Sequence, residues 1–409
     1  MTDAWWWPGG HRAGSLMGTG SFVDALLGVE QAWSRALVGA GVAPAGAAVD
    51  LDPLRSELDV ESLGMAAESS GNPVVPLVGA LRAVLPEPAA TWLHRGLTSQ
   101  DVVDTALVLC ARDAVGAVRA HLRGHARRLA ALVAEHRTSV MLARTLTQPA
   151  VPTTFGAKAA GWLHGVLDAD EQLAALRWPV QLGGAAGTLA APVELAGVQG
   201  ARALRRAFAA ALGLDDVAPW HTRRGPITRI GDAAVSATDA WGRIANDVLA
   251  LGRPEVGELR DGSAGGSSTM PHKANPTLAV LVRRAALAAP PLGGTLHLAS
   301  AEQVDERADG GWHVEWETLA LLLRRTVVAA AQVGDLLAGL QVDTARMAAR
   351  VDELAEDVLA EQVAICRLTG RAPAADYLGL TADLVDEALA RTRTHLELHP
   401  SPRPEEDPS

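Results

Sequence analysis

The sequence predicts an all-α fold dominated by a bundle of long helices. Hydrophobic residues make up 48% of the 409 residues and aromatic residues only 4%, so small and aliphatic side chains must form the core. From Thr98 onward, long Ala- and Leu-rich stretches with helical spacing follow one another with few capping signals. Helices that are apolar around much of their circumference are buried on several sides. One subunit cannot cover that much surface, and we therefore expect an oligomer.

The chain divides into three predicted segments. Residues 1–96 alternate short helical stretches with Pro/Gly breaks, and residues 22–38 within them have the spacing of one amphipathic helix. Residues 97–342 would form the central bundle, with helices expected at 101–135, 154–176, 232–251, 276–289 and 302–340. Residues 343–409 would form a short C-terminal helical domain, ending from His399 in a Pro- and acid-rich tail that we expect to be disordered.

The most informative stretch is the Gly/Ser-rich loop at 265–276. The chain has only two lysines, Lys158 and Lys273, and three asparagines, among them Asn275, so this loop carries one of each rare residue. Asn275 suits an N-cap and Pro276 a first helical position, which predicts that a helix follows. Backbone N–H groups beside glycines and at a helix N-terminus bind anions. The loop therefore suits a site that holds a carboxylate and stabilises extra negative charge on it.

Composition excludes several other classes of protein. The net charge of −11 argues against nucleic acid as a partner. Cys110 and Cys366 stand alone, so we expect no disulfide framework, no metal site and no cofactor held by cysteines. The most apolar predicted helix, near 318–340, contains Arg324, Arg325 and Asp335, which argues against a membrane span. With no basic and apolar leader at the start of the sequence, we expect a cytoplasmic protein.

The segment Gly266-Ser-Ser-Thr-Met-Pro-His-Lys-Ala-Asn-Pro276 resembles the signature loop of the fumarase/aspartase superfamily. That superfamily includes argininosuccinate and adenylosuccinate lyases and the 3-carboxy-cis,cis-muconate cycloisomerases. The resemblance implies a three-segment fold, a homotetramer with active sites shared between subunits, a small polycarboxylate substrate and no cofactor. It assigns movement of a carbon proton to Ser267. Lys273 and Asn275 would stabilise the resulting enediolate.

A second motif precedes the first long helix. Thr98 and Asp101 have the spacing of a capping box, which is a sufficient structural explanation of both. The motif also resembles the first common region of the superfamily, in which the residues matching His94, Thr98 and Ser99 contact the substrate. We therefore predict substrate binding by these three side chains.

Two further stretches read on their own as plain turns, the first with a Thr cap. In residues 144–158 the resemblance matches the catalytic His of the lyases to Leu146 and that of some cycloisomerases to Pro149, so neither is present. Gln148 would bind substrate there. The other turn contains Asn72 and resembles the Gly-Asn-Pro stretch of the cycloisomerases. The resemblance implies that Asn72 binds substrate.

The stretch 302–319 distinguishes best between members of the superfamily. Trp312 and Trp316 have the spacing of a core stripe, and Glu315 is expected on a solvated face. The whole stretch closely resembles the cycloisomerases, which implies that Glu306 orients a catalytic group. Arg307 would add positive charge for a carboxylate.

The resemblance predicts a cycloisomerase that lactonises 3-carboxy-cis,cis-muconate to 4-carboxymuconolactone, in the protocatechuate branch of aromatic degradation. Four positions near the site depart from the cycloisomerase pattern, where an aromatic residue, a His, an Asp and an Arg are usual: Arg95, Pro149, Gly225 and Ala274. Two alternatives therefore stay open. One is a lyase of the same fold that releases fumarate from a substituted succinate, and the other is a non-catalytic scaffold. An adenylosuccinate lyase is disfavoured because its Ser-Ser pair is replaced by Trp312-His313. His94, His221 and His313 are unranked candidates for the second acid/base group.

Overall fold

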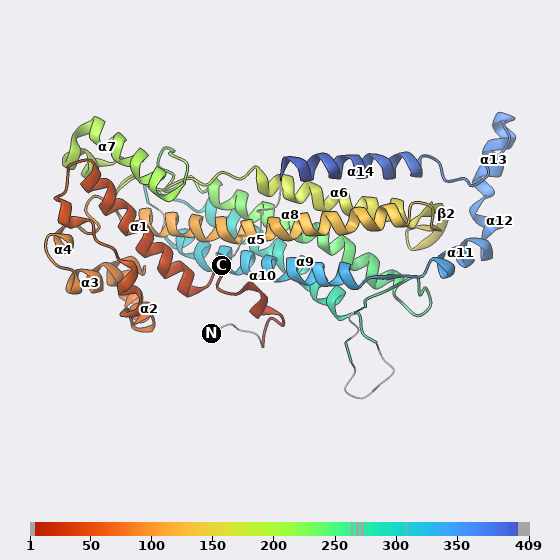
Figure 1. Ribbon diagram of the computed structural model, residues 1–409, viewed down its shortest axis with the longest axis horizontal. Coiled ribbons are helices and arrows are strands. Elements are labelled where there is room, and N and C mark those ends of the chain that lie inside the picture. Colours follow the sequence, from red (N-terminus) through yellow and green to blue (C-terminus); the bar gives the residue numbers. More distant parts are fainter. Residues whose placement is uncertain (1–4, 263–264, 267–269, 271–273, 308, 400–409) are drawn as a thin grey trace, which may run out of the picture.

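The computed structural model describes residues 5–262, 265–266, 270, 274–307 and 309–399. It is an elongated, mainly helical molecule, as the sequence predicts (Figure 1). The α-helices are α1 (Thr19–Gly39), α2 (Val60–Ser70), α3 (Val74–Val84), α4 (Ala89–Trp92), α5 (Ser99–Glu135), α6 (Phe155–Ala174), α7 (Ala190–Leu212), α8 (Gly225–Leu251), α9 (Thr277–Ala301), α10 (Gly310–Gly339), α11 (Thr344–Glu353), α12 (Ala355–Val358), α13 (Ala360–Thr369) and α14 (Thr381–Leu398). Short 3-10 helices occur at Gly10–Ala13, Ala45–Ala47 and Asp52–Ser56. The strands are β1 (Val140–Thr145), β2 (Gln148–Thr154), β3 (Leu259–Arg260) and β4 (Gln341–Val342), and β1 pairs with β2 and β3 with β4, both antiparallel.

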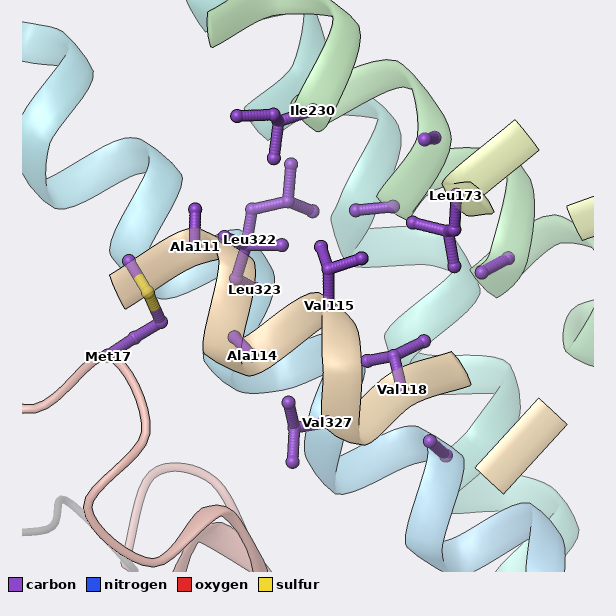
Figure 2. Packing of buried hydrophobic residues seen from close by; sticks show 14 of the residues in the cluster. Met17, Ala111, Ala114, Val115, Val118, Leu173, Ile230, Leu322, Leu323 and Val327 are labelled. Atoms are coloured by element: carbon purple, nitrogen blue, oxygen red, sulfur yellow. The ribbon is translucent and has the colours of Figure 1, made fainter. Parts of the chain in front are cut away.

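The core lies between the long helices of the bundle. Helix α5 packs on α6 and α10, and α9 packs on α8 and α10. Aliphatic side chains from several of these helices interdigitate, and Val115 of α5, Ile230 of α8 and Leu322 of α10 are fully or almost fully buried (Figure 2). Because few aromatic rings separate them, the helices approach one another closely.

The predicted helix at 302–340 is wrong at its start. Helix α9 continues through Pro290 and Pro291 to Ala301, and α10 begins only at Gly310. The Gln303 side chain donates a hydrogen bond to the carbonyl of Ala299 at 2.7 Å, which satisfies an acceptor at the end of α9. Residues 302–307 and 309 thus belong to the connection between α9 and α10, and Glu306 and Arg307 are not on a helix. Helix α7 was not predicted from the sequence.

The predicted turn at 144–158 is a β-hairpin. Strands β1 and β2 pair across Leu146 and Thr147, whose φ angles of 48° and 70° fit the tight turns that hairpins favour. The predicted Thr cap is confirmed, because the Thr154 hydroxyl accepts a hydrogen bond from the N–H of Ala157 at 3.1 Å. The hairpin lies at the far end of α5 from the N-terminal helices (Figure 1).

After Asp343 the shorter helices α11 to α13 appear, as expected. Helix α14 is longer and lies back along α6 (Figure 1). Arg391 of α14 pairs with Asp168 and Glu171 of α6 at 2.6 and 2.9 Å. The division into three segments stays a prediction, and the tail beyond His399 is outside the described residues. Among the helices that the structure describes, none has the length and apolarity needed to cross a membrane.

His125 is buried inside the bundle. His125 of α5 is 3% exposed, and its ring lies edge-on to Trp241 of α8 with 5.8 Å between centroids. Its Nε2 atom lies 3.0 Å from the carbonyl oxygen of Ala330 on α10, so we place the proton of a neutral ring there. Burial, together with the neighbouring His121, lowers the pKa of His125 to about 3.

We expect the free energy of unfolding to fall as the pH drops below about 6.5. The unfolded chain then binds a proton that His125 accepts in the folded state only near pH 3. The loss from this group is at most about 1.4 kcal/mol per pH unit. In His125→Gln, which keeps a donor for Ala330, urea unfolding between pH 6.5 and 4 should show a shallower pH dependence. Equal slopes for the two proteins would contradict this account.

Candidate functional site

The two ends of the signature loop pair with each other. Ser267 and Lys273 lie outside the described residues, so their predicted roles stay predictions. On either side of them, Gly265 and Asn275 exchange backbone hydrogen bonds of 2.9 and 3.0 Å. A Cβ atom at Gly265 would overlap the hydroxyl of Thr277, so this position requires glycine. Gly265 and Asn275 are therefore held side by side next to the start of α9.

The predicted cap of α9 is wrong. Pro276, rather than Asn275, occupies the N-cap position, and it makes no side-chain cap. The Asp261 carboxylate takes that role, because it accepts a hydrogen bond from the N–H of Leu278 at 3.0 Å. The half-buried Asn275 thus keeps its side-chain amide free of hydrogen bonds to the residues that the structure describes. That leaves the amide available for substrate.

Residues 94–101, which resemble the first common region of the superfamily and are called the first common region below, are organised around one buried carboxylate. Asp101 is fully buried in the first turn of α5 and accepts a hydrogen bond from the N–H of Thr98 at 3.0 Å. It also accepts from the N–H groups of Gly183 and Gly184, at 2.8 and 3.0 Å. His221 Nε2 lies 2.9 Å from its Oδ1 atom. A Cβ at Gly183 would lie 2.6 Å from the His221 ring, which explains why glycine occupies this position.

The three candidate histidines have different surroundings. His221 is 4% exposed, and its Nδ1 atom has no hydrogen-bond partner in the described part of the chain. His94 adopts a left-handed φ of 62°, and its Nδ1 atom lies 2.6 Å from Oε1 of buried Glu30. His313 is exposed, with Nε2 2.9 Å from the carbonyl oxygen of Gly71. His94 and His221 each have a carboxylate partner on one ring nitrogen and no hydrogen-bond partner among the described residues on the other, and His221 is the more deeply buried of the two.

Asn72 has a sufficient structural role. Its side chain donates a hydrogen bond to the carbonyl of Ser70 and accepts one from the N–H of Val74, both at 3.1 Å. The plain-turn interpretation thus explains this residue without substrate. The turn lies against the start of α10, where His313 contacts Gly71.

Glu315 is not on a solvated face, contrary to the sequence prediction. It is fully buried, and its carboxylate accepts from Nε and Nη2 of Arg224 at 2.9 and 2.6 Å. Arg224 also donates to both oxygens of Asp104 on α5, at 2.7 and 2.9 Å. Trp312, a core residue as predicted, adds an indole N–H bond of 2.9 Å to Asp104. The helical spacing predicted Glu315 on the solvated face of its helix, because spacing alone could not show that Arg224, at the start of α8, is its partner.

The charges of this cluster depend on one another. Burial raises the pKa of Glu315, against the lowering effect of Arg224. Burial alone would lower the pKa of Arg224, but Asp104 and Glu315 together raise it above its usual value. The cluster ties α5, α10 and the start of α8 together directly beneath the first common region.

The predicted site residues lie in several separate places within one chain. His94, Thr98 and Ser99 lie at one end of α5. Gln148 is exposed on the hairpin at the other end, and the 37 residues of α5 span roughly 55 Å. Glu306 is exposed and Arg307 half-buried in the connection before α10. A single chain therefore does not bring the hairpin to the first common region.

Sequence reasoning missed most of the buried polar residues. Asp101 was recognised only as a cap, and Asp104 and Arg224 were given no role. Asp101 and Asp104 are one turn apart on α5, and this spacing of two acids in an apolar helix was the available signal. Among the described residues, no group of three or more His, Cys, Asp or Glu side chains is close enough to hold a metal ion.

We expect Arg224→Gln to lower the free energy of unfolding by about 3–5 kcal/mol, because Asp104 and Glu315 would remain buried without a counter-charge. Arg223→Gln is the matched control. Arg223 is exposed and its Nη2 donates to the carbonyl of Pro219 at 2.9 Å, so we expect a change within about 0.5 kcal/mol. Urea unfolding of the two variants measures this difference, and equal losses would contradict a special role for Arg224.

Comparisons with known proteins agree with this architecture. A model of the lyase family matches residues 26–289. The chain is 43% identical over 370 residues to a nitrosuccinate lyase of Streptomyces davaonensis, covering 87% of this chain and 78% of that protein. It is 38% identical over 354 residues to a 3-carboxy-cis,cis-muconate cycloisomerase of Bradyrhizobium diazoefficiens, covering 84% and 77%. The crystal structure of the 3-carboxy-cis,cis-muconate lactonizing enzyme from Pseudomonas putida superposes with a TM-score of 0.83 at 31% identity, covering 91% of this chain and 94% of that one. The chain is therefore an enzyme of the lyase family, within the fumarase/aspartase superfamily.

Proposed function

We propose that this enzyme eliminates an anionic leaving group from a substituted succinate and releases fumarate. Its similarity to a nitrosuccinate lyase makes nitrosuccinate the substrate to test first, with nitrite as the leaving group. The observation that carries the proposal is the chemistry of the hairpin, where both positions matched to a catalytic His are occupied by residues that cannot transfer a proton.

Leu146 is 96% exposed at the hairpin tip, and Pro149 is also exposed. An amine leaves a carbon only after it gains a proton, which requires a general acid. Nitrite, like a carboxylate, is the conjugate base of a fairly strong acid and departs without protonation. The absence of an acid at both positions therefore favours an anionic leaving group over an amine.

Arg95 supplies a cation where cycloisomerases usually have an aromatic residue. Its backbone is held by Trp33, whose indole N–H donates to the Arg95 carbonyl at 2.7 Å. Its Nε donates to the carbonyl of Thr91 at 2.6 Å, and its terminal nitrogens make no hydrogen bond to the described residues. A guanidinium can bind two oxygens side by side, as in a nitro or carboxylate group. Arg95, beside His94, is suited to hold the substituent that leaves.

In the proposed reaction, Ser267 acts as its alkoxide and removes the proton from the carbon next to one carboxylate of the substrate, which leaves it as the neutral hydroxyl. Lys273 and Asn275 stabilise the enediolate that forms. The electron pair then makes the carbon–carbon double bond of fumarate, and the C–N bond breaks with its electrons leaving on nitrite. Ser267 returns its proton to water between turnovers.

Lactonisation of 3-carboxy-cis,cis-muconate is the second candidate function, and the superposition on the Pseudomonas putida enzyme favours it. There a carboxylate of the substrate would add to the conjugated double bond, and Ser267 would deliver a proton to the neighbouring carbon. The attacking carboxylate is already ionised, so this reaction also needs no His at Leu146 or Pro149.

We expect the purified enzyme to convert nitrosuccinate to fumarate and nitrite in equal amounts. Ser267→Ala should lose at least about a hundredfold in kcat, because it removes the proton-transfer group. Fumarate is followed by its ultraviolet absorbance and nitrite by a colorimetric assay. Arg95→Trp should lower kcat/KM for nitrosuccinate.

Loss of the diene absorbance of 3-carboxy-cis,cis-muconate instead, again dependent on Ser267, would establish the cycloisomerase. No turnover of either substrate would contradict both.

We also propose that the enzyme is a homotetramer whose active sites are shared between subunits. Two observations support this. Thr98 lies at the opposite end of α5 from the hairpin, and Arg144 of the hairpin pairs with buried Glu258 near the base of the signature loop, at 2.5 Å. Helix α9 also exposes large apolar side chains, Val280, Leu287 and Leu298, at 51%, 68% and 70%. Such a face on a bundle helix is suited to a second copy of the chain.

Mixing two inactive variants tests the shared site. Thr98→Ala and Ser267→Ala should each be inactive alone. When the two are unfolded together and refolded, about a quarter of the sites should combine an intact Thr98 with an intact Ser267 from another subunit. Activity of the mixture is compared with that of each variant refolded alone, and the mass of the assembly is measured by light scattering. A tetramer with no recovered activity would contradict shared sites, and a monomer would contradict the assembly.

A further inference from the structure

A basic pocket lies at the start of α8. It has a volume of about 650 Å³ and is formed where residues 177–179, residues 217–224, the first turn of α8 and the last turn of α9 meet. Its lining contains four arginines and two hydroxyl groups but no carboxylate: Arg177, Arg223, Arg224, Arg229, Thr222 and Ser300. None of the residues predicted to act on the substrate lines it.

Two of the four positive charges have counter-ions. Arg224 is saturated by Asp104 and Glu315. Arg177 is largely exposed, and its Nε and Nη2 donate to Asp215 at 2.9 and 3.0 Å. These two guanidinium groups contribute shape and local field, but their charge is compensated.

The other two positive charges are not compensated. Nη2 of Arg223 donates only to the backbone carbonyls of Ala218 and Pro219, at 3.4 and 2.9 Å. Arg229 makes no hydrogen bond or ion pair with any residue that the structure describes. Two like charges in one concave site repel each other, and an anion between them removes that repulsion.

Gly225 places no charged side chain beside the guanidinium of Arg229. An ideal Cβ at Gly225 would lie 3.1 Å from Nη1 of Arg229, so the guanidinium folds back over the first residue of α8. The similar segment of the cycloisomerases has an Asp at this position, which would pair with that guanidinium. In this chain glycine leaves the charge open to a ligand.

The start of α8 adds to the attraction. The helix begins at Gly225 with Pro226 beside it, and the N-cap residue Arg224 makes no side-chain cap. The positive end of the helix dipole therefore faces the pocket without a capping carboxylate. The hydroxyls of Thr222 and Ser300 can donate to an oxyanion bound there.

We propose that this pocket binds a small dianion through carboxylate or phosphate oxygens held between Arg223 and Arg229. This inference concerns a binding site beyond the proposed function and does not depend on which substrate the enzyme turns over. Both a dicarboxylate and phosphate carry the required pair of negative charges, and the experiment below distinguishes them.

The test is calorimetric titration of the full-length enzyme in a low-salt buffer that contains neither anion. Phosphate and fumarate are the two probes, and chloride is the control for unspecific charge. Gly225→Asp places a carboxylate beside Arg229, in a first helical turn where an acid is favourable. Gly225→Ala is its matched control, because Gly225 is not in the left-handed region and the contacting Arg229 atom is the end of a flexible side chain. Arg229→Gln removes the charge directly.

We expect wild type and Gly225→Ala to bind at least one of the two dianions with the same Kd, and Gly225→Asp and Arg229→Gln to bind it at least about tenfold more weakly. The probe that shows this difference identifies the class of ligand. Fumarate that binds at the catalytic residues instead should show the same Kd in Gly225→Ala and Gly225→Asp. This equality distinguishes it from fumarate bound in the pocket. Equal binding by all four proteins, or no saturable binding of either dianion to wild type, would overturn the proposal.

Discussion

The rest of the structure depends on one buried guanidinium. Arg224 lies between Asp104 of α5 and Glu315 of α10, and none of the three side chains is more than 1% exposed. Either carboxylate would be strongly destabilising there without it. Because Arg224 immediately precedes α8, the pairing fixes where three long helices begin relative to one another. A buried ion network of this kind sets geometry more than it adds stability.

Directly above this cluster, Asp101 holds the first common region. Its two oxygens accept from Thr98, from the Gly183-Gly184 backbone and from His221. The carboxylate therefore cannot also serve as a catalytic base, since its lone pairs are engaged. Its role is to fix the start of α5, so that the side chains of Thr98 and its neighbours are presented without reorganisation.

Positive charge is gathered at several places in the chain that are suited to bind anions. The signature loop leads into the N-terminus of α9, Arg95 follows His94, and Arg223 and Arg229 line the separate basic pocket at the start of α8. The whole chain has a net charge of −11, so these cations are concentrated locally against the general charge of the protein. Such an arrangement raises the local concentration of anions near these cations.

Much of the architecture follows from local sequence. Helical periodicity predicted the bundle, Thr154 the cap of α6, and the Trp312 stripe the core face of α10, because each depends on residues within a turn or two of each other. The partners of Glu315, the cap of α9 by Asp261 and the break before Gly310 were predicted wrongly or not at all. Arg224 lies 91 residues before Glu315 and Asp261 lies 17 residues before the N–H group that it caps, and spacing along the sequence carries no information about such partners. The break before Gly310 is local, at the end of α9 where Gln303 bonds to Ala299, and the helical period alone did not reveal it. The sequence by itself therefore determined most of the long helices, whereas only the tertiary structure decided which charges are buried together, because those charges come from positions far apart in the chain.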